Sequence, residues 1–136
     1  MPSNITYGYQ QMLEEANRDI KTLSVDEAQA LLEHEDVLFV DLRDPRELAR
    51  DGKIPGAFHC PRGMLEFWID PQSPYAKPQF QQDKTFVFFC AGGLRSALSA
   101  HLAQRMGLAP VAHIGGGFGA WKAAGAPVET EKKTEG

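Results

Sequence analysis

The sequence predicts an α/β fold with a largely parallel sheet, and three observations support this. Apolar runs typical of buried strands alternate with helical patterns along the chain. The runs at 37–43 and 85–90 are almost continuously apolar, as expected for strands buried on both faces of a parallel sheet. The second run ends on Cys90, and a helical pattern follows it. Because sites in such sheets lie at the carboxyl ends of strands, Cys90 is a candidate site residue.

Six segments have the spacing or the end signals of helices, and they are expected at 9–19, 25–34, 45–50, 62–68, 95–106 and 118–124. Ser24 and Glu27 have the spacing of a capping box, which predicts a helix start. Pro45 suits the first turn of the next helix, and Gly52 suits its end. The apolar stripe of the longest helix is expected at Leu98, Leu102 and Met106.

Four strands are expected from the residues, at 37–43, 57–60, 85–90 and 111–114. A loop with three prolines covers 70–82, and the three glycines 115–117 form a tight turn. The chain is expected to divide into a helical N-terminal extension (1–20), one domain (21–128) and a charged tail (129–136). The tail has no apolar residue and is expected to be frayed.

Composition excludes several classes of function. The chain has 136 residues, and its formal net charge of −4 argues against a nucleic-acid partner. It has no apolar run long enough for a membrane span and no secretory signal at its N-terminus, which favours the cytoplasm. Its two cysteines, Cys60 and Cys90, are too few for a disulfide framework and have no neighbouring ligands for a metal.

The segment from Cys90 to Ser96 has the layout of a reactive thiol site. Cys90 ends a strand, glycines at 92 and 93 let an anion approach the backbone, and a helix begins directly afterwards. Arg95 is unfavourable near a helix N-terminus unless it has another role, so it is a candidate for binding an anion. Ser96 is either an early helix residue or a hydrogen-bond donor to the loop. The alternative for Cys90 is a buried structural cysteine.

Four ordered motifs resemble those of the single-domain rhodanese family over about 23–128. They are Val40-Asp-Leu-Arg43 followed by Glu47, Gly52-Lys-Ile-Pro-Gly-Ala57, the loop from Cys90 to Arg95, and Gly116-Gly-Phe-Gly-Ala-Trp121. Lys53 replaces the histidine usual in the second motif, a departure that concerns structure more than chemistry.

The resemblance implies a rhodanese-like fold, with a central, mostly parallel sheet of five strands and helices on both faces. It also implies a sulfurtransferase in which Cys90 accepts a sulfane sulfur as a persulfide and passes it to cyanide or a thiol. Arg95 would hold an anionic donor such as thiosulfate, and no cofactor is needed beyond the persulfide. Small-molecule donors and acceptors are expected, and a protein acceptor is also compatible. The loop amides come from Ala91, Gly92, Gly93, Leu94, Arg95 and Ser96, and a pocket rim is expected at Arg62, Met64 and Trp68.

Other polar residues have mainly structural interpretations. Asp41 and Arg43 alternate on an apolar strand, and the spacing predicts an ion pair between Arg43 and Glu47, with Asp41 also a candidate for the pocket rim. Cys60 is either a resolving thiol for Cys90 or, as we favour, a small buried residue. The histidines at 59, 101 and 113 are expected to be ordinary helix and strand residues.

Two further functions compete with sulfur transfer. A phosphatase or arsenate reductase of the same fold has a cysteine loop with five residues before the arginine, whereas only four residues separate Cys90 from Arg95. Phe89 also stands where tyrosine phosphatases typically have a histidine. A non-catalytic adaptor, in which Cys90 carries sulfur or senses oxidation, is the third hypothesis, because fold and loop do not establish turnover.

Overall fold

The structure is a computed structural model that describes residues 3–130, and its centre is a five-stranded parallel sheet. The strands are β1 (Lys21–Leu23), β2 (Val37–Asp41), β3 (Phe58–His59), β4 (Thr85–Phe89) and β5 (Val111–Ile114). Their order is β1-β5-β4-β2-β3, and every neighbouring pair is parallel. The α/β class predicted from the sequence is confirmed, and the carboxyl ends of the strands meet at one edge.

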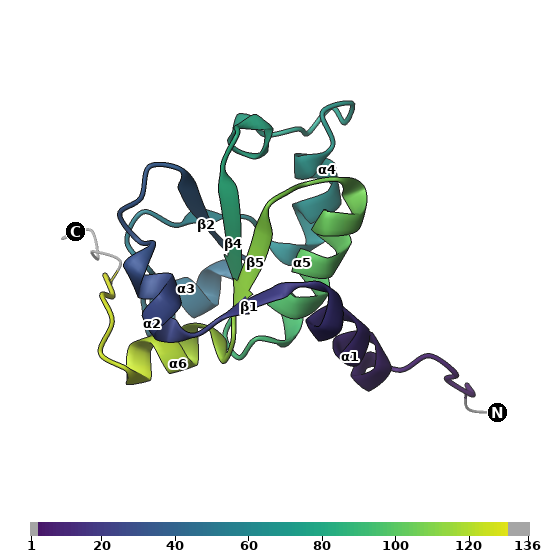
Figure 1. Cartoon of the computed structure of the whole chain (residues 1–136), viewed down its shortest axis with the longest axis horizontal. Coiled ribbons are helices and arrows are strands. Elements are labelled where there is room, and N and C mark those ends of the chain that lie inside the picture. The colour runs from purple at the N-terminus through teal and green to yellow at the C-terminus, as the bar shows by residue number, and fades with distance from the viewer. Residues whose placement is uncertain (1–2, 131–136) are drawn as a thin grey trace.

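Six α-helices lie within residues 3–130, and they cover both faces of this sheet (Figure 1). They are α1 (Tyr9–Asp19), α2 (Val25–Ala30), α3 (Pro45–Asp51), α4 (Leu65–Ile69), α5 (Leu94–Met106) and α6 (Gly117–Ala123). Helices α1, α4 and α5 cover one face, and α2, α3 and α6 cover the other. Short 3₁₀ helices at Arg62–Met64 and Pro78–Gln81 lie in the connection between β3 and β4.

The central strand β4 divides its apolar side chains between two cores. Phe86 and Phe88 pack with α1, α4 and α5, while Val87 and Phe89 pack with α2 and α6. All four side chains are at most 1% exposed. Burial on both faces explains why this strand has no polar alternation in the sequence.

Helix α5 contacts the sheet through small residues, not through the leucine stripe expected from the sequence. Its buried apolar residues are Ala97, Ala100 and Ala103. Leu98 is only partly buried against the core, Leu98 and Leu102 line a cavity with Met12 of α1, and Met106 is 39% exposed. The large aromatic residues of β4 fill the space under α5, so the helix needs small residues to approach the sheet.

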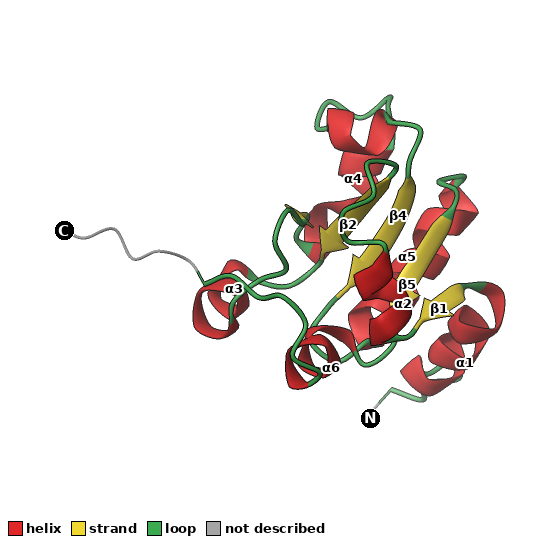
Figure 2. Cartoon of the chain, turned by 60° about the vertical axis from the view of Figure 1, so that its left-hand side comes forward, coloured by secondary structure: helices red, strands yellow, loops and turns green. Residues whose placement is uncertain are grey.

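The N-terminal segment is tied to the sheet by a strand that the sequence analysis did not identify. β1 pairs with β5 and forms one edge of the sheet, with α1 beside it (Figure 2). Ala16 and Ile20 are buried in the core under α5. The division of the chain into extension, domain and tail remains a prediction, and most of the predicted tail (131–136) lies outside the described residues. Its first residue, Glu129, exchanges two backbone hydrogen bonds of 2.9 Å with Lys53.

The capping box that begins α2 is confirmed, but this helix is shorter than expected. Ser24 Oγ accepts a hydrogen bond from the Glu27 amide at 3.1 Å, and Glu27 Oε1 accepts one from the Ser24 amide at 2.9 Å. The helix ends at Ala30, not at residue 34, because the following amides bond to carbonyls three residues back. This tighter turn leads the chain directly into β2.

No helix within residues 3–130 is long and apolar enough to cross a membrane.

Candidate active site

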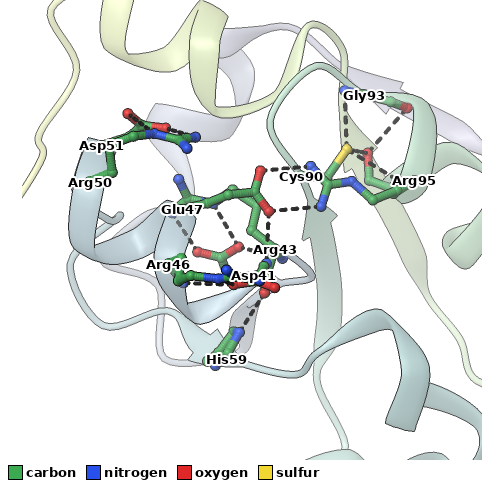
Figure 3. Close-up of polar contacts among 12 residues, drawn as sticks. Asp41, Arg43, Arg46, Glu47, Arg50, Asp51, His59, Cys90, Gly93 and Arg95 are labelled. Atoms are coloured by element: carbon green, nitrogen blue, oxygen red, sulfur yellow. Dashed lines mark hydrogen bonds and ion pairs between the residues drawn. The ribbon is translucent and has the colours of Figure 1, made fainter.

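The candidate site is the loop between β4 and α5, where Cys90 lies at the carboxyl end of the central strand. The Cys90 side chain is buried, and its Sγ accepts hydrogen bonds from the amide of Gly93 at 3.1 Å and of Ser96 at 3.4 Å (Figure 3). Gly93 has φ +102°, which turns the chain so that its amide points to the sulfur. Two amides at the start of α5 therefore favour a negative charge on Cys90. Gly92 and Leu94 are exposed at the loop surface.

The other side of the loop is fixed by the first residues of α6. The amide of Phe118 donates to the Cys90 carbonyl at 2.7 Å, and that of Gly119 donates to the Ala91 carbonyl at 2.9 Å. The backbone at Gly117 runs so close to this loop that a Cβ there would lie 2.5 Å from Cys90 O. The glycine-rich segment before Trp121 thus packs against the backbone of Cys90 and Ala91 and fixes the position of the loop.

Arg95 reaches from the loop to α3, where it forms a two-pronged ion pair with Glu47. Its Nη1 and Nη2 donate to the two carboxylate oxygens of Glu47, each at 2.9 Å. Glu47 also accepts a hydrogen bond from the Asp44 amide at 2.8 Å, as part of the capping box of α3. The Arg95 hydrogen bonds, more than any other contact, lower the pKa of Glu47 to about 2. The charge of Arg95 is therefore balanced by a carboxylate in this structure.

The expected pair between Arg43 and Glu47 is wrong, because Arg43 pairs with Asp41. Arg43 Nε and Nη2 donate to the two Asp41 oxygens at 3.0 and 2.8 Å, and both side chains are 1% exposed. Arg43 Nη2 also donates to Gly52 O at 2.9 Å, and its guanidinium carbon lies 4.2 Å from the ring centroid of Phe118. This buried pair holds β2, the end of α3 and the start of α6 together.

Sequence reasoning missed a polar chain that leads away from Cys90. Ser96 Oγ lies 3.6 Å from Cys90 Sγ and 2.9 Å from His113 Nδ1. His113 Nε2 lies 3.2 Å from Thr22 Oγ1 of β1. The signal in the sequence is a histidine within an otherwise apolar strand, although the pattern alone is that of an ordinary strand residue.

Two of the cavities formed by residues 3–130 adjoin the cysteine loop, and none of the four expected rim residues lines either of these two. One cavity, of about 380 Å³, is lined by Arg43, Asp51, Ala91, Phe118, Gly119, Lys122 and Ala123. The other, of about 250 Å³, is lined by Leu13, Asn17, Thr22, Gly92, Gly93, Leu94, His113, Gly115 and Gly116.

The expected rim residues have other surroundings. Arg62 lines a separate cavity between α1 and α5, Trp68 packs on Phe58, and Met64 ends the first 3₁₀ helix. Their place at a rim, like that of Asp41, remains a prediction.

Cys60 is fully buried, and desolvation raises the pKa of its thiol to about 12. It is therefore a neutral thiol at ordinary pH, consistent with a small buried residue. Within residues 3–130, no group of three or more His, Cys, Asp and Glu side chains is arranged to hold a metal ion.

Glu47→Gln is expected to reduce the acid sensitivity of the fold. Since the pKa of Glu47 (about 2) lies below its ordinary value of 4.5, the stabilisation by Arg95 is complete above pH 4.5 and is lost as the pH falls toward 2. We expect the variant to lose about 1 kcal/mol less than the wild type between pH 7 and 3, because the 40% exposed Arg95 side chain is screened by water.

Denaturant unfolding at the two pH values measures this difference. Glu33→Gln, a change at an exposed glutamate after α2, is the control and should follow the wild type. Equal acid sensitivity in the Glu47 variant and the wild type would contradict the prediction.

Known proteins resemble this chain over most of its length. A model of the rhodanese-like domain family matches residues 24–124. A sulfurtransferase of Allochromatium vinosum is 32% identical over 101 residues, which are 74% of this chain and 86% of that protein. The mitochondrial thiosulfate sulfurtransferase RDL2 of Saccharomyces cerevisiae is 30% identical over 83% of this chain and 80% of its own length.

A solved structure from Rhodopseudomonas palustris is 67% identical and covers 95% of this chain and 99% of its own, with a TM-score of 0.92. It is described as a protein of unknown function and a possible tyrosine phosphatase.

Proposed function

The chain belongs to the rhodanese-like domain family, and on that premise we propose that it is a sulfurtransferase that carries sulfur on Cys90. The observation that carries the proposal is the pair of amides, from Gly93 and Ser96, that point to Cys90 Sγ at 3.1 and 3.4 Å. These amides stabilise the thiolate that acts as nucleophile, and later the negative charge of a persulfide.

The proposed reaction has two displacement steps at sulfur. The Cys90 thiolate attacks the outer sulfur of thiosulfate, the sulfur–sulfur bond of the donor breaks, and sulfite leaves with the electron pair of that bond. Cys90 now carries a persulfide. A thiolate or cyanide then attacks the terminal sulfur, and Cys90 leaves as the thiolate, ready for the next donor. Neither step needs a cofactor or a general base on Cys90.

We propose that Arg95 binds the anionic part of the donor. Its ion pair with Glu47 limits how the donor can reach the guanidinium. Both terminal nitrogens of Arg95 already donate to Glu47, while 40% of the Arg95 side chain remains exposed. A donor anion must therefore share the guanidinium with Glu47 or displace it. This arrangement favours a donor that gains binding energy from other parts of the site as well.

A phosphatase is the second candidate, because the R. palustris protein is described as a possible tyrosine phosphatase. The loop argues for sulfur instead. Only four residues separate Cys90 from Arg95, which suits a single sulfur atom better than a phosphoryl group with its three outer oxygens.

Treatment with thiosulfate is expected to add the mass of one sulfur atom to the wild-type protein, and cyanide is expected to remove it. Intact-mass measurement before and after each reagent tests this. Cys90→Ala should gain no mass, and the matched control Cys60→Ala should gain it as the wild type does.

Three results would count against the proposal. They are no added sulfur in the wild type, added sulfur in Cys90→Ala, and a persulfide that neither cyanide nor a thiol discharges. The last would favour a sulfur-carrying adaptor. Hydrolysis of p-nitrophenyl phosphate that depends on Cys90, without sulfur loading, would favour the phosphatase.

A further inference from the structure

We propose that His113 is a positioning residue for Cys90, which acts through Ser96 and has its own orientation fixed by Thr22. The inference rests on the proposed function only in that both require a Cys90 thiolate. Its basis is the continuous chain of polar contacts between Thr22 at the edge of the sheet and Cys90 at its centre. The three residues of the chain come from β1, β5 and α5, which lie side by side in the fold.

The hydroxyl of Ser96 is the link that contacts the sulfur. Its Oγ lies 3.6 Å from Cys90 Sγ, 3.4 Å from the Gly93 carbonyl and 2.9 Å from His113 Nδ1. A hydroxyl has one proton, so it can donate to only one of these groups. If His113 Nδ1 carries a proton and donates to Ser96, the Ser96 proton is directed to Cys90 or Gly93. A thiolate is the stronger acceptor of the two because it is charged.

Burial favours the neutral form of His113, in which the ring carries a single proton. The side chain is 3% exposed, and this burial lowers its pKa. The cavity of about 250 Å³ beside it is lined by no aspartate, glutamate, lysine or arginine that would favour or oppose a second proton. On the side of α3, the charge of Arg95, which interacts with Cys90, is balanced by Glu47.

The hydroxyl of Thr22 contacts the other ring nitrogen of His113 and can donate a hydrogen bond to it. Its Oγ1 lies 3.2 Å from Nε2, and the residue is exposed at the edge strand. When the Thr22 hydroxyl donates to Nε2, the proton of His113 resides on Nδ1 and points to Ser96. Each hydrogen bond in the chain then runs in one direction, from Thr22 through His113 and Ser96 to the Cys90 thiolate. The edge strand β1 thereby contributes a side chain to the hydrogen-bond chain that ends on Cys90.

Alkylation of Cys90 by iodoacetamide across pH 5–9 tests the inference, because the rate follows the thiolate fraction and needs no sulfur donor. In Ser96→Ala the midpoint of the pH–rate profile is expected to rise by about one pH unit, as for the loss of one hydrogen bond to a charged group. His113→Phe is expected to shift it in the same direction. Where the rate of each variant no longer rises with pH, the rates should agree within about twofold.

Matched controls and a rescue separate positioning from a general loss of structure. Ser99→Ala removes a buried hydroxyl with no hydrogen-bond partner from the same helix, and it should leave the profile unchanged. Thr22→Val is nearly isosteric at an exposed site and should give a small upward shift, while Thr85→Val at the start of β4 should give none. His113→Asn, whose amide reaches only the Nδ1 position, should shift the midpoint less than His113→Phe. It also keeps the test open if the phenylalanine variant does not fold.

The result that would overturn the proposal is a pH–rate profile in His113→Phe that coincides with the wild type while Ser96→Ala shifts. Where His113→Phe does not fold, a shift in His113→Asn as large as that in Ser96→Ala, with none in Thr22→Val, would overturn it. A loss of rate that is equal at every pH would also overturn it, since that indicates a blocked or disordered loop. These outcomes are independent of sulfur loading: the protein can fail to accept sulfur from thiosulfate and still show the predicted shifts.

Discussion

Arg43→Met is expected to lower the free energy of unfolding by about 3–5 kcal/mol, because it leaves Asp41 charged and buried without its partner. Asp41 is 1% exposed, and both of its carboxylate oxygens accept hydrogen bonds from Arg43. The change also removes a hydrogen bond to Gly52 O and the guanidinium stacked 4.2 Å from the Phe118 ring centroid. Methionine retains much of the apolar length of arginine, so the loss is mainly electrostatic.

Denaturant unfolding measures this effect, and two further variants define its cause. Arg46→Met removes an arginine whose side chain is 93% exposed, and it should change stability by less than about 0.5 kcal/mol. The double variant Asp41→Leu with Arg43→Met removes both charges and should be more stable than Arg43→Met alone. If Arg43→Met is within about 1 kcal/mol of the wild type, the pair is not the structural connection that we describe.

Gly117→Ala is expected to lower the stability by about 3 kcal/mol and to impair sulfur loading of Cys90. A Cβ at this position would lie 2.5 Å from Cys90 O and 2.7 Å from Ala91 O, both of them backbone atoms that cannot rotate away. Relief of this contact requires the cysteine loop and the start of α6 to separate. That movement breaks the 2.7 Å hydrogen bond from the Phe118 amide to Cys90 O.

Gly125→Ala is the matched control for this change. Gly125 has φ +77° and Gly117 has φ +63°, so both variants place a Cβ on left-handed backbone, but nothing lies within 4 Å of a Cβ at Gly125. It should cost about 1 kcal/mol and leave sulfur loading intact. Thermal unfolding and intact-mass analysis of the two variants give the comparison. Equal stability losses, or full sulfur loading in Gly117→Ala, would contradict the close support of the loop by α6.

Features encoded by neighbouring residues were predictable from the sequence. Helix α3 begins at Pro45 and is followed by Gly52 at φ +89°, as its end signals predict. The cysteine loop was predictable for the same reason, since a strand, two glycines and a helix start adjoin one another in the chain. The strand β1 was not, because three residues of mixed polarity have no pattern of their own and become a strand only by pairing with β5.

The partners of the site residues depend on contacts far apart in the chain, and these the sequence did not reveal. The spacing of Arg43 and Glu47 suggested an ion pair of helical type, but that rule requires both residues to lie on one helix. Arg43 precedes the start of α3 and turns back to Asp41, which leaves Glu47 for Arg95, 48 residues away. The contact between Ser96 and His113 likewise exists only because α5 lies over β5.

The position of β1 has a consequence for where this chain can be shortened. The family match begins at residue 24, directly after β1 ends at Leu23. A fragment cut at that boundary would retain Cys90, Arg95 and the whole loop, yet it would expose the backbone of β5 as a new sheet edge. Unpaired edges of this kind promote association between chains. Domain boundaries taken from the family alone would thus produce a fragment that retains Cys90 but has an unpaired sheet edge at β5.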